Sequence, residues 1–201
     1  MRIFGKIIVG ILPFVPKFVV RWISRRYVAG DSLDKATIVL KKLDDSGFST
    51  TIDVLGEEIK SLDEATLFFD EYVRVLDIIS KHNFNANISI KPTAFGLLID
   101  RTFAHDKVAE LVTLAKERNI FVRLDMEDHR VTDATIELLL NLHEKNLDNV
   151  GTVLQARLFR TTDDVSRIFG KLNGATDFRI CKGIYLEPKE ISHTEYTDIV
   201  K

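Results

Sequence analysis

The chain has 201 residues, 45% of them hydrophobic, which is enough to bury a sizeable core in one domain or most of one. Its 28 basic and 30 acidic residues leave a formal net charge of −2, which argues against nucleic acid or a strongly acidic partner. Cys181 is the only cysteine, so the chain has neither an internal disulfide nor a cysteine cluster for a metal, as is usual in a reducing cytoplasm.

Residues 1–30 are apolar but interrupted by basic residues and prolines. No unbroken run reaches the roughly 18 residues of a membrane-spanning helix. No small-residue cleavage site marks a signal peptide. Basic residues interleaved with Phe14, Phe18 and Trp22 fit either a segment on a membrane surface or a helical arm packed on the domain. We therefore expect an N-terminal arm over 1–30 and the main domain over 31–201.

Helix and strand patterns alternate from residue 31 onward. Asp31-Ser32-Leu33-Asp34 and Ser61-Leu62-Asp63-Glu64 both resemble helix-capping boxes. The first predicts a helix to about residue 45, and the second a long amphipathic helix whose apolar positions include Leu67, Leu76 and Ile79. Further helices are expected over 107–118, 132–145 and 161–172. Strands are expected over 49–55, 87–91, 120–125, 150–155 and 177–182.

This alternation predicts βαβ units and a parallel sheet, either doubly wound or closed as a barrel. A doubly wound sheet usually has a glycine-rich turn after its first strand, and Val54-Leu55-Gly56-Glu57-Glu58 lacks that pattern. We therefore predict an α/β fold, a (β/α)8 TIM-type barrel. Such a barrel needs eight strands and about 250 residues, and only about five β/α units are visible here. The chain is expected to be truncated, or to close in a way that its sequence does not reveal.

Each predicted strand ends on a polar or charged residue. The carboxyl ends of parallel barrel strands meet at one rim, where such barrels carry their chemistry. The sequence therefore predicts a site at this rim, formed by Asp53, Lys91, Asp125, Gln155, and Arg179 or Lys182.

Lys91 follows an apolar strand and precedes Pro92, which disfavours helix at Lys91. A lysine in this place would bind an anion or form a Schiff base, or it is simply a solvated lysine at a strand end.

Asp125 belongs to a stretch with three carboxylates and a histidine within five residues, which suggests metal binding. Strand alternation, however, puts only Glu127 on the same face as Asp125, with Asp128 and His129 in the following loop. An ion-paired or hydrogen-bonded carboxylate is therefore favoured for Asp125 over a metal ligand.

Gln155 is either a ligand contact at the barrel mouth, because an amide both donates and accepts, or a core-edge glutamine. Arg179 and Lys182 place two cations on one short strand. This arrangement costs free energy unless anions or a cofactor neutralise the two charges. Cys181 between them is either a buried structural thiol or a residue packed beside a cofactor. No nucleophile–histidine arrangement is apparent, and His105 and His143 fit structural positions, which points to a cofactor.

Six segments, in this order and at this spacing, resemble proline dehydrogenases, over about 27–188. They are Tyr27-Val28-Ala29-Gly30-Asp31, Asp53-Val54-Leu55-Gly56-Glu57, Ser89-Ile90-Lys91-Pro92-Thr93, Arg123-Leu124-Asp125-Met126-Glu127, Leu154-Gln155-Ala156 and Cys181-Lys182-Gly183-Ile184-Tyr185.

The resemblance implies an FAD-dependent barrel enzyme that oxidises L-proline to Δ1-pyrroline-5-carboxylate and passes the electrons to a membrane quinone. It implies that Lys91 pairs with the proline carboxylate, with Asp125 nearby and Tyr185 lining the pocket. Gln155 and Arg179 would contact the flavin ring, and Lys182 the polar groups of the cofactor. The enzyme would be cytoplasmic, with the arm 1–30 as a peripheral membrane contact.

The family's late-barrel Tyr-x-x-Arg-Arg motif, which clamps the proline carboxylate, has no counterpart in this sequence. Arg25-Arg26 lies before the first strand and is not that motif. Two alternatives to the active enzyme follow. One is an inactive barrel fragment, with exposed apolar sheet edges, that serves as an interaction or membrane-surface module. The other is a Schiff-base lyase that uses Lys91 or Lys182.

Overall fold

The computed structural model describes residues 15–16, 19, 29 and 32–200, so the predicted arm over 1–30 lies almost entirely outside the described residues. The chain divides into two compact units, Met1–Phe48 and Ser49–Lys201. In the first unit, α3 (Leu33–Asp45) is capped by Ser32, whose hydroxyl accepts a hydrogen bond from the Lys35 N–H at 3.5 Å. The predicted capping box would place the cap at its first residue, Asp31, but the cap is Ser32, which has extended backbone ahead of the first turn.

The second unit contains five parallel strands in the order β1-β2-β3-β4-β5. They are β1 (Thr50–Asp53), β2 (Ala86–Ile90), β3 (Val122–Leu124), β4 (Val150–Gln155) and β5 (Phe178–Cys181). The helices are α4 (Leu62–His82), α5 (Arg101–Glu117), α6 (Thr132–Glu144), α7 (Thr161–Lys171) and α8 (Tyr196–Ile199), with a 3-10 turn, η2 (Pro92–Phe95).

Two details of the helices differ from the sequence expectation. α5 begins six residues before the expected residue 107, because the Asp100 carboxylate accepts the Phe103 N–H at 3.0 Å and caps the helix there. In α4, Leu76 and Ile79 are buried as expected, but Leu67 is 68% exposed. The buried stripe runs through Ala65, Phe69 and Tyr72, and Leu67 lies on the opposite side of the helix from it.

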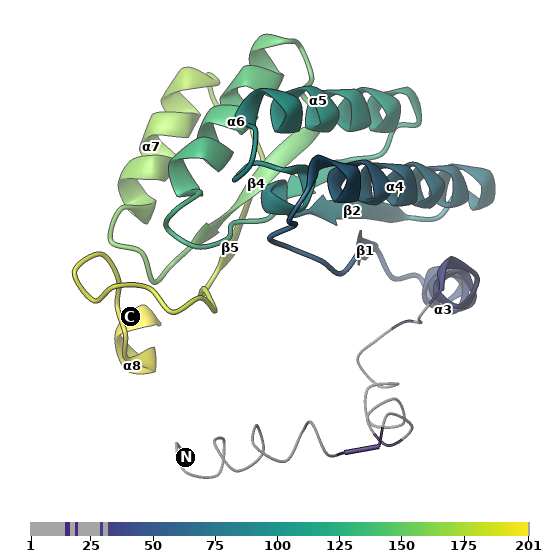
Figure 1. Ribbon diagram of the computed structural model, residues 1–201, viewed down its shortest axis with the longest axis horizontal. Helices are drawn as coiled ribbons and strands as arrows, with labels where there is room; N and C mark the ends of the chain where they lie inside the picture. Colours follow the sequence, from purple (N-terminus) through teal and green to yellow (C-terminus); the bar gives the residue numbers. More distant parts are fainter. Residues whose placement is uncertain (1–14, 17–18, 20–28, 30–31, 201) are drawn as a thin grey trace. The chain divides into compact units, whose positions relative to one another are not determined.

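The helices α4 to α7 lie on one face of the sheet (Figure 1). A doubly wound fold would carry helices on both faces, so this arrangement supports the barrel expectation. Beneath the helices the sheet is apolar, and Ile88, Val122 and Leu124 are fully buried. The strands β2 and β3 thus bury an apolar face under the helices.

The opposite face of the sheet is more polar and curls. The register pairs Asp53 with Ser89 and Ser89 with Arg123, so these side chains share that face. Arg179 on β5 donates a hydrogen bond to the Thr51 hydroxyl on β1 at 3.3 Å, although β1 and β5 are the two ends of the sheet. This contact between the end strands identifies the sheet as a curled part of a β/α barrel.

Arg123 occupies the inside of this curl. Its guanidinium forms an ion pair with Asp177 at 2.5 Å and lies over the Phe121 ring. Gly151 makes room for it, because a Cβ there would lie 2.9 Å from the Arg123 Nη1 and 2.3 Å from the Asp177 carbonyl oxygen. The buried Arg123 side chain therefore occupies the interior below the carboxyl ends of the strands, and its partner Asp177 is exposed and directly precedes β5.

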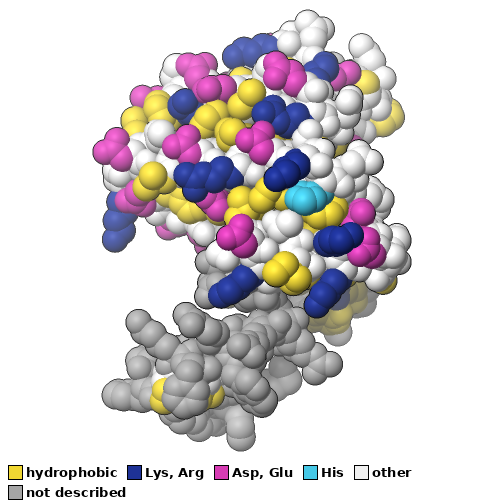
Figure 2. Space-filling model, turned by 90° about the vertical axis from the view of Figure 1, so that its right-hand side faces the viewer, with side chains coloured by type: hydrophobic (Ala, Val, Ile, Leu, Met, Phe, Trp, Pro, Cys, Tyr) yellow, Lys and Arg dark blue, Asp and Glu magenta, His cyan; other side chains and the backbone are white. Residues whose placement is uncertain are grey.

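On the face shown in Figure 2, acidic and basic side chains alternate with hydrophobic ones. No helix in the described part of the chain is long and apolar enough to cross a membrane.

Candidate active site at the carboxyl ends of the strands

Lys91 and Asp53 form an ion pair where β1 and β2 end. The Lys91 Nζ lies 2.6 Å from the Asp53 Oδ2, and both side chains are largely shielded from solvent. Burial alone would lower the pKa of Lys91, but the hydrogen bond and charge of Asp53 outweigh it, so the net pKa is raised. Lys91 is therefore a fixed, protonated cation at the rim.

Tyr72, on α4, holds the other side of Asp53. Its hydroxyl donates to the Ser89 carbonyl at 2.7 Å, lies 3.1 Å from the Asp53 Oδ1, and accepts the Val54 N–H at 3.1 Å. Burial first, and then the charge of Asp53, raises the pKa of Tyr72 well above its usual value, so the hydroxyl stays protonated. A helix side chain thus fixes the carboxylate that fixes Lys91.

Asp125 lies directly after β3, where its backbone N–H donates to the Ile90 carbonyl at 2.8 Å. Its Oδ1 accepts a hydrogen bond from the Ser89 hydroxyl at 2.6 Å. The side chain is therefore tied to β2 and lies one strand away from the Lys91–Asp53 pair.

Glu127 is a buried carboxylate that the sequence did not single out as a site residue. It is 3% exposed, and its two oxygens accept hydrogen bonds from the Thr93 N–H, at 3.0 Å, and from the Thr93 hydroxyl. Burial raises the pKa of Glu127 to about 7, although both Thr93 hydrogen bonds favour the charged form. The only sequence signal was its position two residues after Asp125.

The four polar residues of 125–129 do not converge on one point. Asp128 is bound by Arg130, and His129 Nδ1 lies 2.6 Å from the Glu187 carboxylate. The Asp125 carboxylate instead accepts a hydrogen bond from Ser89, and the Glu127 carboxylate accepts hydrogen bonds from Thr93. No group of three potential metal-binding side chains gathers anywhere among the residues that the structure describes.

Gln155 lies at the end of β4 and is 1% exposed. Its Nε2 donates to the carbonyls of Met126, at 3.0 Å, and Glu127, at 2.9 Å, which fixes the orientation of the amide. Its Oε1 is buried and has no partner among the described residues. A Cβ at Gly183, whose φ is +89°, would lie 2.5 Å from this oxygen, so glycine leaves the acceptor its space.

Tyr185 lies in the loop after β5 and donates to the Glu57 carboxylate, in the loop after β1, at 2.9 Å. Burial first, then the hydrogen bond and charge of Glu57, raises the pKa of the Tyr185 hydroxyl. Arg157 donates to the Tyr185 carbonyl and fixes the backbone of the same residue.

Arg179 on β5 and Lys182 directly after it bind hydroxyl groups. Arg179 donates to Thr51 across the curl of the sheet, and Lys182 donates to the Tyr196 hydroxyl while its Nζ lies 4.3 Å from the Tyr196 ring centre. Both side chains are exposed, and Cys181 between them is half-buried rather than buried as the structural-thiol reading had it.

The structure thus brings Lys91, Asp125 and Gln155 to consecutive strand ends. It also connects Tyr185 by a hydrogen bond to Glu57 in the loop after β1. Tyr72, Thr93 and Glu127, which the sequence reasoning missed, hold these residues in place. Tyr72 carried no signal, because a tyrosine in an amphipathic helix is ordinarily read as core.

The fold and the rim define a class of protein: a β/α barrel domain with buried polar groups at the carboxyl ends of its strands, where barrel enzymes carry their active sites. The sequence model of the family described as "Proline dehydrogenase" matches residues 36–199. The chain belongs to the proline dehydrogenase family, which confirms the resemblance seen in its sequence.

Named relatives agree. Proline dehydrogenase 1 of Bacillus subtilis (strain 168) is 30% identical over 169 residues, which cover 84% of this chain and 55% of the relative. Proline dehydrogenase of Deinococcus radiodurans is 30% identical over 181 residues, 88% of this chain and 57% of the relative. The chain therefore spans little more than half the length of these relatives.

A solved structure, proline utilization A from Bdellovibrio bacteriovorus inactivated by N-propargylglycine, superposes with a TM-score of 0.71 at 26% identity. The match covers 80% of this chain and 20% of that one. It confirms the β/α barrel-type fold predicted from the alternation of strands and helices.

Proposed function

We propose that this chain carries the first part of a proline dehydrogenase active site, which binds FAD and oxidises L-proline to Δ1-pyrroline-5-carboxylate. The observation that carries the proposal is the protonated Lys91, held by Asp53 at 2.6 Å on the rim of a proline dehydrogenase-type barrel. A fixed cation is what a carboxylate substrate needs for orientation.

In this proposal Lys91 binds the proline carboxylate. Asp125, held by Ser89, lies one strand further along the rim and lines the site beside it. Tyr185 closes the pocket from the loop after β5, where Glu57 keeps its hydroxyl oriented. The oxidation removes a hydride and a proton from proline, and the task of these three residues is to hold the ring in one orientation while that happens.

The residues at the end of β4 and after β5 fit a flavin. The Gln155 Oε1 is a buried acceptor that lacks a partner among the described residues, as expected where a ring N–H of a ligand binds. Arg179 would lie against the same ring, and Lys182 would bind the polar groups of the cofactor. When bound, FAD supplies the hydride acceptor that the protein side chains cannot supply.

The electron acceptor in this proposal is a membrane quinone, and the enzyme is a cytoplasmic protein that touches the membrane through residues 1–30. Support for this comes from the apolar, basic character of that segment.

A Schiff-base reaction at Lys91 is disfavoured. A nucleophilic lysine needs a lowered pKa so that it is neutral at working pH. The pKa of Lys91 is instead raised by its bond to Asp53.

The test is an anaerobic flavin spectrum of the chain purified with excess FAD, before and after addition of L-proline, with D-proline as the control. Bleaching of bound flavin by L-proline alone is the expected result. Bound flavin that stays oxidised would contradict the proposed activity of this chain, and failure to retain flavin would contradict the cofactor assignment as well.

A further inference from the structure

Glu127 and Thr93 form a buried pair that connects the ends of three strands. Each residue is 3% exposed, and both carboxylate oxygens of Glu127 are occupied by Thr93, one by its N–H and one by its hydroxyl. The main-chain carbonyl of Glu127 accepts from Gln155 at 2.9 Å. The pair therefore joins the chain after β2 to the chain after β3, and through Gln155 to β4.

The Thr93 hydroxyl makes a second hydrogen bond. It accepts the backbone N–H of Glu58, in the loop between β1 and α4, at 3.1 Å. A hydroxyl can donate one hydrogen bond and accept two, so the Thr93 hydroxyl can bond to the Glu58 N–H and the Glu127 carboxyl group at the same time. Glu58 has a φ of +50°, a conformation that costs a non-glycine residue energy and persists where surrounding contacts hold it.

The residues on either side of this tie belong to the candidate site. Glu57, next to Glu58, accepts the Tyr185 hydroxyl at 2.9 Å. Lys91 precedes Thr93 by two residues, with Pro92 between them fixing the backbone. A displacement of Thr93 would therefore move Lys91 and release Glu57 and Tyr185.

We propose that Thr93 and Glu127 are positioning residues that hold the β1–α4 loop and Lys91 in one arrangement, so that the pocket for a small carboxylate is formed before the ligand binds. The carboxylate pocket itself rests on the proposed function, whereas the hold on the loop does not.

Glu58 itself is also held by an ion pair, and the test must distinguish the effect of this pair from that of the Thr93 hydrogen bond. Arg130 forms an ion pair with the Glu58 carboxylate, with the two side chains 49% and 54% exposed. An exposed pair of this kind contributes little to order. Arg130→Gln removes this pair and leaves Thr93 intact.

The first measurement is amide hydrogen exchange of Glu58 by NMR, without ligand. Thr93→Val removes the hydroxyl at nearly constant volume and is expected to speed exchange of the Glu58 amide about tenfold. Thr93→Ser should restore protection, and Arg130→Gln should leave it within about twofold. Thr135→Val is the matched control, because Thr135 is fully buried on α6 and its hydroxyl has no partner among the described residues.

The second measurement is calorimetric titration of the flavin-loaded chain with cyclopentanecarboxylate, a carboxylate of proline's size that flavin cannot oxidise in the same way. Thr93→Val is expected to weaken binding about tenfold, Thr93→Ser to recover it, and Thr135→Val to leave it unchanged. Glu127→Gln, which keeps the shape of the side chain, should weaken binding as well.

Equal Glu58 exchange in Thr93→Val and Thr135→Val would overturn the proposal, as would deprotection by Arg130→Gln alone. Changed exchange with unchanged carboxylate affinity would overturn the positioning role. If the unaltered chain binds no carboxylate while Thr93→Val still frees the Glu58 amide, the proposed function fails and the hold on the loop stands.

Discussion

At the scale of single residues, the site depends on polar groups buried beneath the rim. The single hydroxyl of Tyr72 forms hydrogen bonds with Asp53, the Ser89 carbonyl and the Val54 N–H. Removal of that hydroxyl leaves buried partners without a hydrogen bond, which costs more than the bond itself contributes.

Tyr72→Phe is therefore expected to lower the free energy of unfolding by about 1 to 3 kcal/mol, measured by urea denaturation. Tyr196→Phe is the control, because Tyr196 is 61% exposed, and its effect should stay within about 0.5 kcal/mol. Equal effects of the two substitutions would show that the Tyr72 hydroxyl does not hold Asp53.

In the proposed function, carboxylate binding depends on Lys91. Lys91→Met keeps the aliphatic length and removes the charge, and loss of a charged hydrogen bond is worth about 1.5 to 3 kcal/mol. We expect cyclopentanecarboxylate to bind about 10- to 100-fold more weakly, measured by calorimetry. Lys107→Met, which breaks a surface pair with Glu110 on α5, should bind as the unaltered chain does. Undiminished binding by Lys91→Met would remove this lysine from the substrate site.

Glu127 makes stability depend on pH. Its pKa is about 7 in the folded chain, against 4.5 ordinarily, because burial outweighs the Thr93 hydrogen bonds; nearby Glu57 raises it further and Lys91 lowers it. Between these two values the folded chain holds a proton that the unfolded chain has released, so this contribution to stability is complete at low pH and is lost as the pH rises through about 7.

The free energy of unfolding, taken relative to Glu127→Gln, is expected to fall by about 2 to 3 kcal/mol from about pH 5 to about pH 8. Urea denaturation of both proteins across this range measures it. A difference between them that does not change with pH would mean that Glu127 ionises near its ordinary value.

At the scale of elements, one device recurs after four helices. Asn83, Asn119, Asn146 and Asn173 each follow a helix, with φ between +50° and +60°, and each is exposed. Asparagine and glycine tolerate this left-handed conformation, which ends a helix and turns the chain toward the next strand. The four residues mark the βα repeat in the sequence itself.

Asn119→Val is accordingly expected to lower the free energy of unfolding by about 1 to 2 kcal/mol, since a β-branched residue is strained at positive φ. Asn119→Gly, which removes the same side chain without that strain, should leave stability equal or slightly higher. Thermal denaturation distinguishes the two, and a loss of the same size in both would point to the side-chain amide instead of the backbone.

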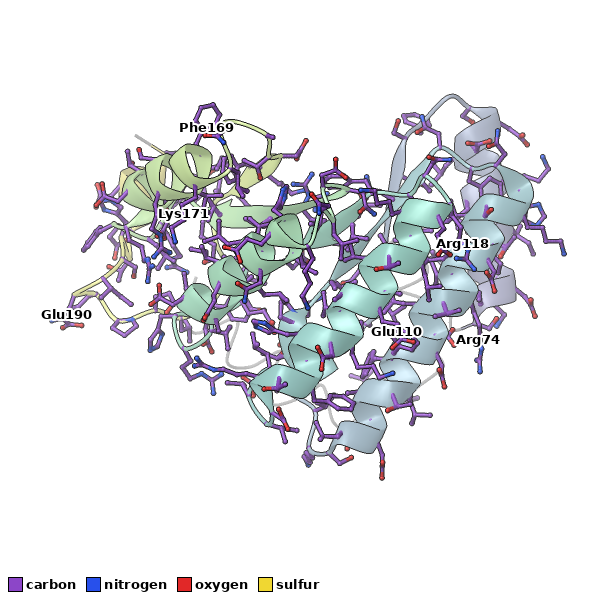
Figure 3. All side chains as sticks on the ribbon, turned by 90° about the horizontal axis from the view of Figure 1, so that it is seen from above. Arg74, Glu110, Arg118, Phe169, Lys171 and Glu190 are labelled. Atoms are coloured by element: carbon purple, nitrogen blue, oxygen red, sulfur yellow. The ribbon has the colours of Figure 1, made fainter. Side chains whose placement is uncertain are left out.

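At the scale of the whole second unit, the sheet ends at β5. No further strand pairs with β5 in the described part of the chain, and Ile180, on its helix-facing side, is 55% exposed. Phe169, near the C-terminal end of α7, is also 55% exposed (Figure 3). An apolar strand with free backbone groups is a site for association with other chains.

We therefore expect the chain to self-associate at high concentration and Ile180→Lys to reduce this, with a stability change within about 0.5 kcal/mol. Sedimentation velocity measures the effect. Leu67→Lys is the control, because Leu67 is equally apolar and 68% exposed but lies on the solvent side of α4. A monodisperse monomer, or equal effects of the two substitutions, would contradict association through β5.

The sequence by itself determined the alternation of strands and helices, the class of the fold and the polar residues at the strand ends. It did so because hydrophobic periodicity, capping residues and strand-end chemistry are local properties. The sequence predicted two local details wrongly. The helix α5 begins directly after its cap, Asp100, and not at the expected residue 107. Leu67 of α4 is exposed and does not belong to the buried stripe of that helix.

Only the tertiary structure decided which rim residues form ion pairs and hydrogen bonds with one another. The 2.6 Å pair of Lys91 and Asp53, the Tyr72 hydroxyl beneath it and the burial of Glu127 against Thr93 join residues 19 to 38 positions apart. Hydrogen-bond partners and desolvation depend on neighbours from other strands and helices, and no local pattern encodes them. Glu127 shows the difference most clearly: in the sequence it is one of three nearby carboxylates, and in the fold it is the buried one whose pKa rises to about 7.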